Sequence, residues 1–168
     1  MRGVYYLQRL LFVKRLSFFI LCYNSIMEKH IFEQRVFYAD TDSYGIVWHG
    51  SYLRWMEMGR VYWTEMKGLG LIDLRDNHDI VIPVANINIK YKMSAKIDDI
   101  MVVETQLQSY NGLSAVFKQV ISNKESGKVY IEAEVTVVAV NKDGKLYRKM
   151  PQVLVEVFDQ ELKCPQLV

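Results

Sequence analysis

The stretch "SYLRWMEMGRVYWTEMK", residues 51–67, decides the fold, because it predicts one long helix with a single buried face. Apolar and small residues recur in it with the i, i+3, i+4 spacing of such a face: Tyr52, Trp55, Met56, Gly59, Trp63 and Met66. Gly68 and Gly70 follow directly. Glycine accepts the left-handed conformation that commonly ends a helix, so we expect the helix to stop there.

Strand patterns lie on both sides of this helix. Residues 31–39 mix alternation with aromatic side chains, and from Ile80 onward apolar and polar residues alternate, as in half-buried strands. Asn111-Gly112, Ser126-Gly127 and Asp143-Gly144 divide the second region by turns, the first of which is a strong hairpin signal. A short helix at residues 152–160 is expected after Pro151, because proline's missing N–H costs nothing in a first helical turn.

The predicted order is therefore one strand, the long helix and four antiparallel strands in a meander. A sheet with one apolar face needs a cover, and one long helix is available for it. We predict an α+β fold of the hotdog type, in which a curved antiparallel sheet of about five strands wraps around the helix. The sheet edges would be protected by pairing across a two-fold axis, so a homodimer or homotetramer is expected.

The composition is that of an ordinary globular protein, with 51% hydrophobic and 24% charged residues in a chain of 168. The net charge is +2, but residues 1–26 carry four cations and no acid, which leaves the rest at −2. Cations in that remainder are scattered, so no nucleic-acid partner is expected. The two cysteines, Cys22 and Cys164, form no CxxC pair, which fits a reducing compartment and a cytoplasmic location.

Residues 1–26 differ from the rest of the chain. A basic flank precedes an apolar run at residues 16–23, which is too short to span a bilayer. No small-residue cleavage site follows that run. We expect residues 1–26 to be an extension outside the fold, either from an upstream start codon or as a targeting or membrane-contacting segment. Residues 27–168 are expected to form a single domain.

An acidic turn, "ADTDSYG" at residues 39–45, joins the first predicted strand to the helix. Asp42 would lie near the helix start, where backbone N–H groups lack intrahelical partners and carry the positive end of the helix dipole. Such donors suit an oxyanion, and a carboxylate beside them could attack a carbonyl or activate water. Gly45 would let the backbone approach a ligand closely. These residues equally fit a simple cap and turn, whereas a metal site is disfavoured by too few oxygen ligands.

The longer segment around this turn resembles the signature of the 4-hydroxybenzoyl-CoA thioesterase family, in particular the acyl-CoA thioesterases of bacterial Tol-Pal gene clusters. The matching positions are Tyr38, Asp40, Thr41, Asp42, Gly45, Ile46, Val47, Trp48, His49, Tyr52, Leu53, Arg54, Trp55 and Glu57. The resemblance covers residues 28–158, with the later strands similar in pattern more than in letters.

The resemblance implies an enzyme that hydrolyses an acyl-CoA to the free acid and CoA, without a metal and without a cofactor other than the CoA of the substrate. Asp42 would be the nucleophile or general base, and His49 would act through its side chain or its backbone N–H. The N–H groups of residues 48–50 would hold the oxyanion. Asp40 would be a turn or surface residue, and Tyr44 would narrow the acyl pocket. Residues expected to contact the substrate are Tyr38, Gly45, Val47, Trp48 and Tyr52.

Two other functions stay open. One is a hydratase or dehydratase of acyl thioesters, in which His49 would face Asp42. The other is a non-catalytic adaptor that binds an acyl carrier protein or a membrane edge. Candidate cations for the CoA phosphates, which equally fit ordinary strand surfaces, are Lys90, Lys92, Arg148 and Lys149.

Several further side chains are expected to have structural rather than catalytic roles. Trp48, Trp55 and Trp63 are expected in the core or in a pocket wall. His30 and His78 are placed in a terminal segment and a polar loop, and Glu57 is expected to be a supporting hydrogen-bond partner.

Overall fold

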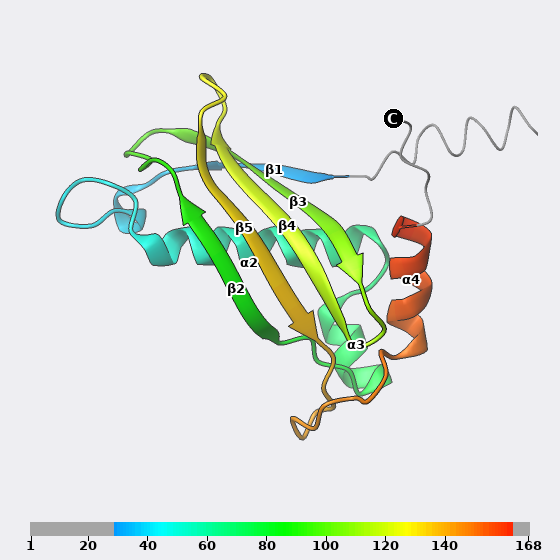
Figure 1. Ribbon diagram of the computed structural model, residues 1–168. Coiled ribbons are helices and arrows are strands. Elements are labelled where there is room, and N and C mark those ends of the chain that lie inside the picture. Colours follow the sequence, from blue (N-terminus) through cyan, green and yellow to red (C-terminus); the bar gives the residue numbers. More distant parts are fainter. Residues whose placement is uncertain (1–28, 163–168) are drawn as a thin grey trace, which may run out of the picture.

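A five-stranded antiparallel sheet packs against one long helix in the computed structural model, which describes residues 29–162 (Figure 1). The strands are β1 (His30–Arg35), β2 (Val84–Tyr91), β3 (Ile100–Tyr110), β4 (Ser114–Asn123) and β5 (Val129–Val138). The helices are α2 (His49–Met66), α3 (Leu71–His78) and α4 (Gln152–Leu162), with a 3₁₀ turn, η1 (Tyr38–Asp40), after β1. The predicted hotdog architecture is confirmed, whereas the expectation for residues 1–26 lies outside the described residues.

Helix α2 buries the face that its sequence predicts, except for Met66 at the helix end, which is 44% exposed. Trp55, Met56 and Trp63 are fully buried against the sheet. The helix approaches the sheet most closely at Gly59, where an added Cβ would lie 2.4 Å from Thr105 Oγ1. Gln119 of β4 braces this contact, because its Nε2 donates to Met56 O at 2.8 Å and to Thr105 Oγ1 at 2.7 Å. The position and direction of α2 on the sheet are therefore fixed by polar bonds as well as by packing.

The strand order is β1-β3-β4-β5-β2, so the predicted four-strand meander is wrong for β2. Strand β1 pairs with β3 and occupies the place that β2 would take in a meander. Strand β2 instead pairs with β5 and forms the opposite edge of the sheet. The prediction that β2 is half-buried is also wrong, because an edge strand that α2 does not cover leaves most of its side chains exposed.

Two local features differ from the sequence expectations. Strand β1 ends at Arg35, four residues earlier than expected, because the chain turns into η1. His78 ends a helix, α3, rather than lying in a loop. Within residues 29–162, none of the helices combines the length and the apolar character needed to cross a bilayer.

Candidate active site

The acidic turn is closed by its own backbone and by the Asp42 carboxylate. Asp42 N donates to Ile46 O at 2.9 Å, and Gly45 N donates to Asp42 O at 3.0 Å. Tyr44 N donates to Asp42 Oδ1 at 2.8 Å, which orients the carboxylate and leaves Oδ2 without a hydrogen bond from residues 29–162. Gly45 has φ +72°, the left-handed region that glycine tolerates best. A Cβ there would meet no other atom of residues 29–162 within 4 Å, so the turn itself needs glycine for its φ angle, and the close approach of a ligand at Gly45 stays a prediction.

Asp40 is a structural residue, only 3% exposed, so its expected place on the surface is wrong and its place in a turn is confirmed. Its Oδ2 accepts from Phe37 N at 2.9 Å, and its Oδ1 pairs with the Arg54 guanidinium. Its backbone carbonyl accepts from Trp48 N at 2.9 Å and from Ser51 Oγ at 3.1 Å. Because the Trp48 N–H is used in this way, the oxyanion donors expected at residues 48–50 are reduced to two.

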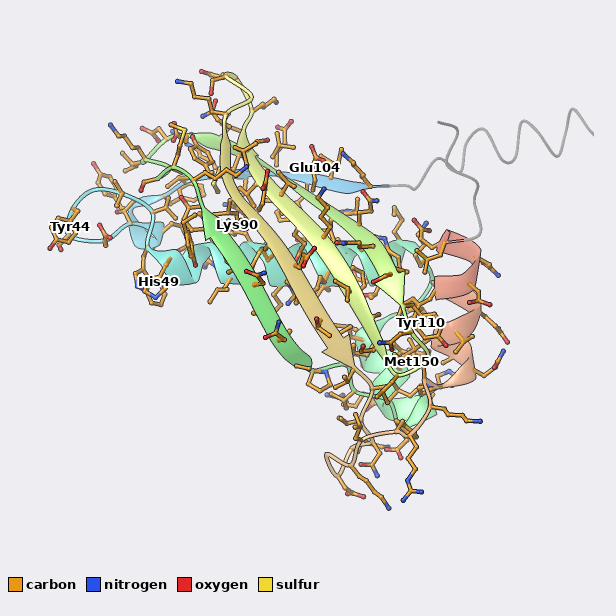
Figure 2. All side chains as sticks on the ribbon, viewed as in Figure 1. Tyr44, His49, Lys90, Glu104, Tyr110 and Met150 are labelled. Carbon is orange, nitrogen blue, oxygen red and sulfur yellow. The ribbon has the colours of Figure 1, made fainter. Side chains whose placement is uncertain are left out.

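These two donors are the backbone N–H groups of His49 and Gly50, the first residues of α2. No residue in the described part of the chain accepts a hydrogen bond from either, as expected for the first turn of a helix. His49 and Asp42 line the same cavity of about 330 Å³. Figure 2 shows the His49 ring projecting from the helix start, at the same end of the molecule as Tyr44. Asp42 and His49 therefore line one hollow, beside the helix start that carries the two free N–H donors.

Tyr52 and residues 91–94 also line this cavity. Tyr52 is buried, and its Oη accepts from Ala95 N at 2.9 Å, while Ala95 O accepts from Val47 N at 2.9 Å. Burial raises the pKa of Tyr52, so its phenol stays protonated. Lys92 also lines the cavity and pairs with Glu132 at 2.5 Å.

Of the residues expected from sequence, the structure brings Asp42, Val47, His49 and Tyr52 together and leaves others apart. Tyr38 is 84% exposed in η1 and is not a strand residue. Trp48 is 52% exposed, so its expected place in the core is wrong. Its ring lies across Gly50, where an added Cβ would be 2.1 Å from it. Tyr44 is 87% exposed at the loop tip and does not line the Asp42 cavity (Figure 2).

The candidate phosphate ligands also separate. Of the four lysines and arginines, only Lys92 lines the Asp42 cavity, whereas Lys90 lines a different hollow on the sheet. Arg148 and Lys149 directly precede Met150, which lies at the end of the molecule opposite His49 (Figure 2). Within residues 29–162, no cluster of three or more His, Cys, Asp or Glu side chains could hold a metal ion.

A larger groove of about 560 Å³ runs between α2 and β2. It begins at Gly50 and reaches α4, and its apolar walls include Leu53, Val61, Ile82, Val84, Ile87 and Phe158. Gly50 follows His49, so the groove and the Asp42 cavity flank the first turn of α2. Arg60 also lines the groove and donates from Nη1 to Gln119 Oε1 at 2.8 Å. Sequence reasoning missed this site, although a glutamine at the centre of an apolar strand was a visible signal.

Comparisons with known proteins agree on one family. The family described as the thioesterase-like superfamily matches residues 36–158. The chain is 36% identical to the "Putative acyl-CoA thioesterase YneP" of Bacillus subtilis, over 67% of this chain and 80% of that protein. It is 34% identical to the "Acyl-CoA thioester hydrolase YbgC" of Escherichia coli, over 75% of this chain and 92% of that protein. The crystal structure of YbaW, a probable thioesterase from Escherichia coli, matches with a TM-score of 0.67 and 29% identity, covering 80% of this chain and 99% of that one.

Proposed function

This chain belongs to the thioesterase-like superfamily, and on that basis we propose that it is an acyl-CoA thioesterase, which hydrolyses an acyl-CoA to the free acid and CoA. One structural observation carries the proposal. Asp42 and His49 line one cavity at the start of α2, where the backbone N–H groups of His49 and of the next residue, Gly50, are free. A carbonyl placed there would find an anion to attack it or to activate water, and donors for the oxyanion.

We propose that the thioester oxygen binds the N–H groups of His49 and Gly50, so that negative charge developing on it is stabilised at the positive end of α2. Asp42 then acts in one of two ways. Its free oxygen attacks the acyl carbon, CoA leaves as thiolate, and water hydrolyses the resulting anhydride. Alternatively, Asp42 takes a proton from water, whose oxygen bonds to the acyl carbon as the C–S bond breaks. Either route consumes one water and needs no resident cofactor or metal.

The acyl group would occupy the groove between α2 and β2. That groove starts at Gly50, directly beside the proposed oxyanion donors, and its walls are mostly apolar. Its volume of about 560 Å³ lies within the usual range for small-molecule sites. The CoA moiety would extend from the Asp42 cavity, on the other side of the helix start. Lys92 is the one expected phosphate ligand that lines this cavity. An acyl carrier protein is the alternative acyl donor, because its thioester has the same reactive bond.

The proposal includes a homo-oligomer, with a second copy paired along β2. This edge has free backbone groups and exposes the apolar side chains of Val84, Ile87 and Tyr91. Paired β2 strands would continue the sheet across two chains and would bring the partner's α2 over the groove. Pairing in a dimer would give the free backbone groups of β2 hydrogen-bond partners. A tetramer would need a further contact surface between dimers. A cytoplasmic location also belongs to the proposal, since the widely spaced cysteines fit a reducing compartment.

The test is Asp42→Asn with thiol release from acyl-CoA as the measurement. Asparagine keeps an oxygen for the Tyr44 N–H, so the turn is retained while the charge is lost. We expect kcat to fall at least about 100-fold, as is typical when a general base is removed. Asp143→Asn is the matched control, because Asp143 is exposed in a loop after β5 and lines neither cavity.

Other outcomes would overturn the proposal. Turnover by Asp42→Asn at the parent rate would remove Asp42 from the chemistry. Hydration of an enoyl-CoA without thiol release would favour a hydratase. Stable binding of an acyl carrier protein, with no hydrolysis of any acyl-CoA, would favour an adaptor.

A further inference from the structure

We propose that Arg60 makes this protein selective for acyl groups that carry a neutral oxygen, a hydroxyl or oxo group, far from the thioester. The inference rests on the proposed function, because it assumes that the acyl group enters the groove between α2 and β2. It concerns the part of the substrate that does not react. The observation behind it is that a buried glutamine holds Arg60 in a groove whose walls are mostly apolar.

Arg60 is held in place by a bond network that ends at the groove. Both N–H groups of the Gln119 amide are used, by Met56 O and Thr105 Oγ1. Its oxygen must therefore face Arg60, which donates to it from Nη1. Gln119 is fully buried, so the hydrogen-bond network that holds Arg60 is rigid.

The rest of the Arg60 guanidinium has donors to spare. Guanidinium carries five N–H groups, and residues 29–162 supply no second hydrogen-bond or ion-pair partner for it. Burial lowers the pKa of Arg60, although arginine remains charged at any ordinary pH. Arg60 is only partly exposed, so donors without a protein partner cost free energy, and an oxygen on the ligand would relieve that cost.

Charge favours a neutral oxygen over a carboxylate. Glu57 precedes Arg60 by one helical turn, lines the same groove and already offsets its charge. The other cation in the groove wall, Arg54, is paired with buried Asp40. An acyl carboxylate would therefore leave the groove with a net negative charge, whereas a hydroxyl or oxo group would accept a hydrogen bond without changing it.

The helix itself sets how far this oxygen lies from the thioester. From Gly50 to Arg60 the helix advances about 15 Å, at 1.5 Å per residue. Long helical side chains lean back toward the N-terminus, so the Arg60 guanidinium lies somewhat closer to Gly50 than this rise, but still far from it. An oxygen next to the thioester, as in a 3-hydroxyacyl group, would therefore not reach Arg60. The selected oxygen should lie well along the acyl chain.

The experiment measures kcat/KM for pairs of acyl-CoAs of equal chain length, with and without an oxo group, moving that group along the chain. For the parent we expect a preference of about 10- to 100-fold at one distal position, the usual contribution of a hydrogen bond to a charged group. No preference is expected at the third carbon. In Arg60→Met the distal preference should fall to about one. Arg75→Met is the matched control, because Arg75 is exposed on α3, pairs with Asp76 and does not line the groove.

The ratio within a pair separates selectivity from any general loss of folding, since both substrates meet the same enzyme. If Arg60→Met does not fold, Arg60→Lys keeps the charge and a donor to Gln119 but loses the fork, and the preference should fall several-fold. Equal rates for both members of every pair in the parent, or an unchanged ratio in the variants, would overturn the inference and leave the thioesterase proposal intact. No thiol release from any pair would instead count against the proposed function itself.

Discussion

The two ends of α2 differ in nearly every physical respect. At its C-terminal end, Trp63 is fully buried and packs on Phe117 at 5.0 Å between ring centroids, while α4 closes over it. Lys67 pairs with the buried Glu161 of α4 at 2.7 Å. At the N-terminal end, two N–H groups are free, and the loop that carries Asp42 projects from the molecule (Figure 1). The closed end holds the fold, whereas the open end leaves donors and charges available to a ligand.

Unpartnered polar groups on α2 are tolerated at its open end. Helix ends normally satisfy their orphan groups with caps, and α2 has no side-chain cap at Trp48. The uncapped N–H groups cost free energy at the N-terminal end, where Asp42 lies. Packing at the C-terminal end compensates for that cost. Stability and activity should therefore respond to substitutions at opposite ends of the same helix.

The largest effect on stability is expected for tryptophan at the closed end. Trp63→Ala should cost about 3–5 kcal/mol of unfolding free energy, because it leaves a large cavity between α2, β4 and α4. Trp48→Ala, at the open end of the same helix, should cost less than about 1 kcal/mol, because that ring is half exposed. Urea unfolding of both variants measures the difference. Equal losses would contradict the division of α2 into a closed and an open end.

A smaller effect, on both stability and activity, is expected for Asp40. Asp40→Ala removes the acceptor for Phe37 N–H and the partner of Arg54, which should cost about 1–3 kcal/mol. It should also lower thiol release, since the turn that aims Asp42 loses its anchor. Asp76→Ala removes an exposed ion pair on α3 and should leave the unfolding free energy almost unchanged, because water screens such a pair.

Two other results at Asp40 would separate its effect on folding from its effect on the site. If Asp40→Ala unfolds as the parent does but loses activity, the anchor serves only the geometry of the site. If it loses stability and keeps full activity, the turn is aimed by its backbone bonds alone.

The sequence predicted the closed end better than the open end, for a physical reason. Trp55 and Trp63 recur at helical spacing, so their burial follows from a local pattern. The burial of Asp40 depends on Arg54, fourteen residues later and on another element. Nothing in the local pattern of an Asp-x-Asp turn distinguishes the buried acid from the one that faces a cavity.

The same reasoning explains the errors in the sheet. The alternation of β2 predicted a strand correctly, but its place at the edge depends on β1 pairing with β3, and that pairing joins residues 65 to 75 positions apart, from Arg35–Ile100 to His30–Thr105. The Arg60–Gln119 bond joins residues 59 apart. Periodicity identifies elements, whereas the partners that create polar sites are found only once those elements are packed.

The smallest expected effect belongs to the closed end, at His30 of β1. Its ring lies against Tyr62 of α2 with centroids 5.6 Å apart, and its buried Nδ1 has no hydrogen-bond partner in the described residues. Burial lowers the pKa of His30 from its usual 6.5, so the unfolded chain binds this proton more readily than the folded one. The stabilising contribution is therefore complete above pH 6.5 and declines as the pH falls from there toward the folded-state pKa.

His30→Phe keeps a ring against Tyr62 and removes the titration. We expect the melting temperature of this variant to fall less than that of the parent between neutral and mildly acidic pH. His78→Phe, at the exposed end of α3, is the control. Its melting temperature should fall between neutral and mildly acidic pH as much as that of the parent. A parent and a His30→Phe variant with parallel pH profiles would mean that protonating His30 costs nothing, and that the contact between β1 and α2 is looser than the packing at Trp63.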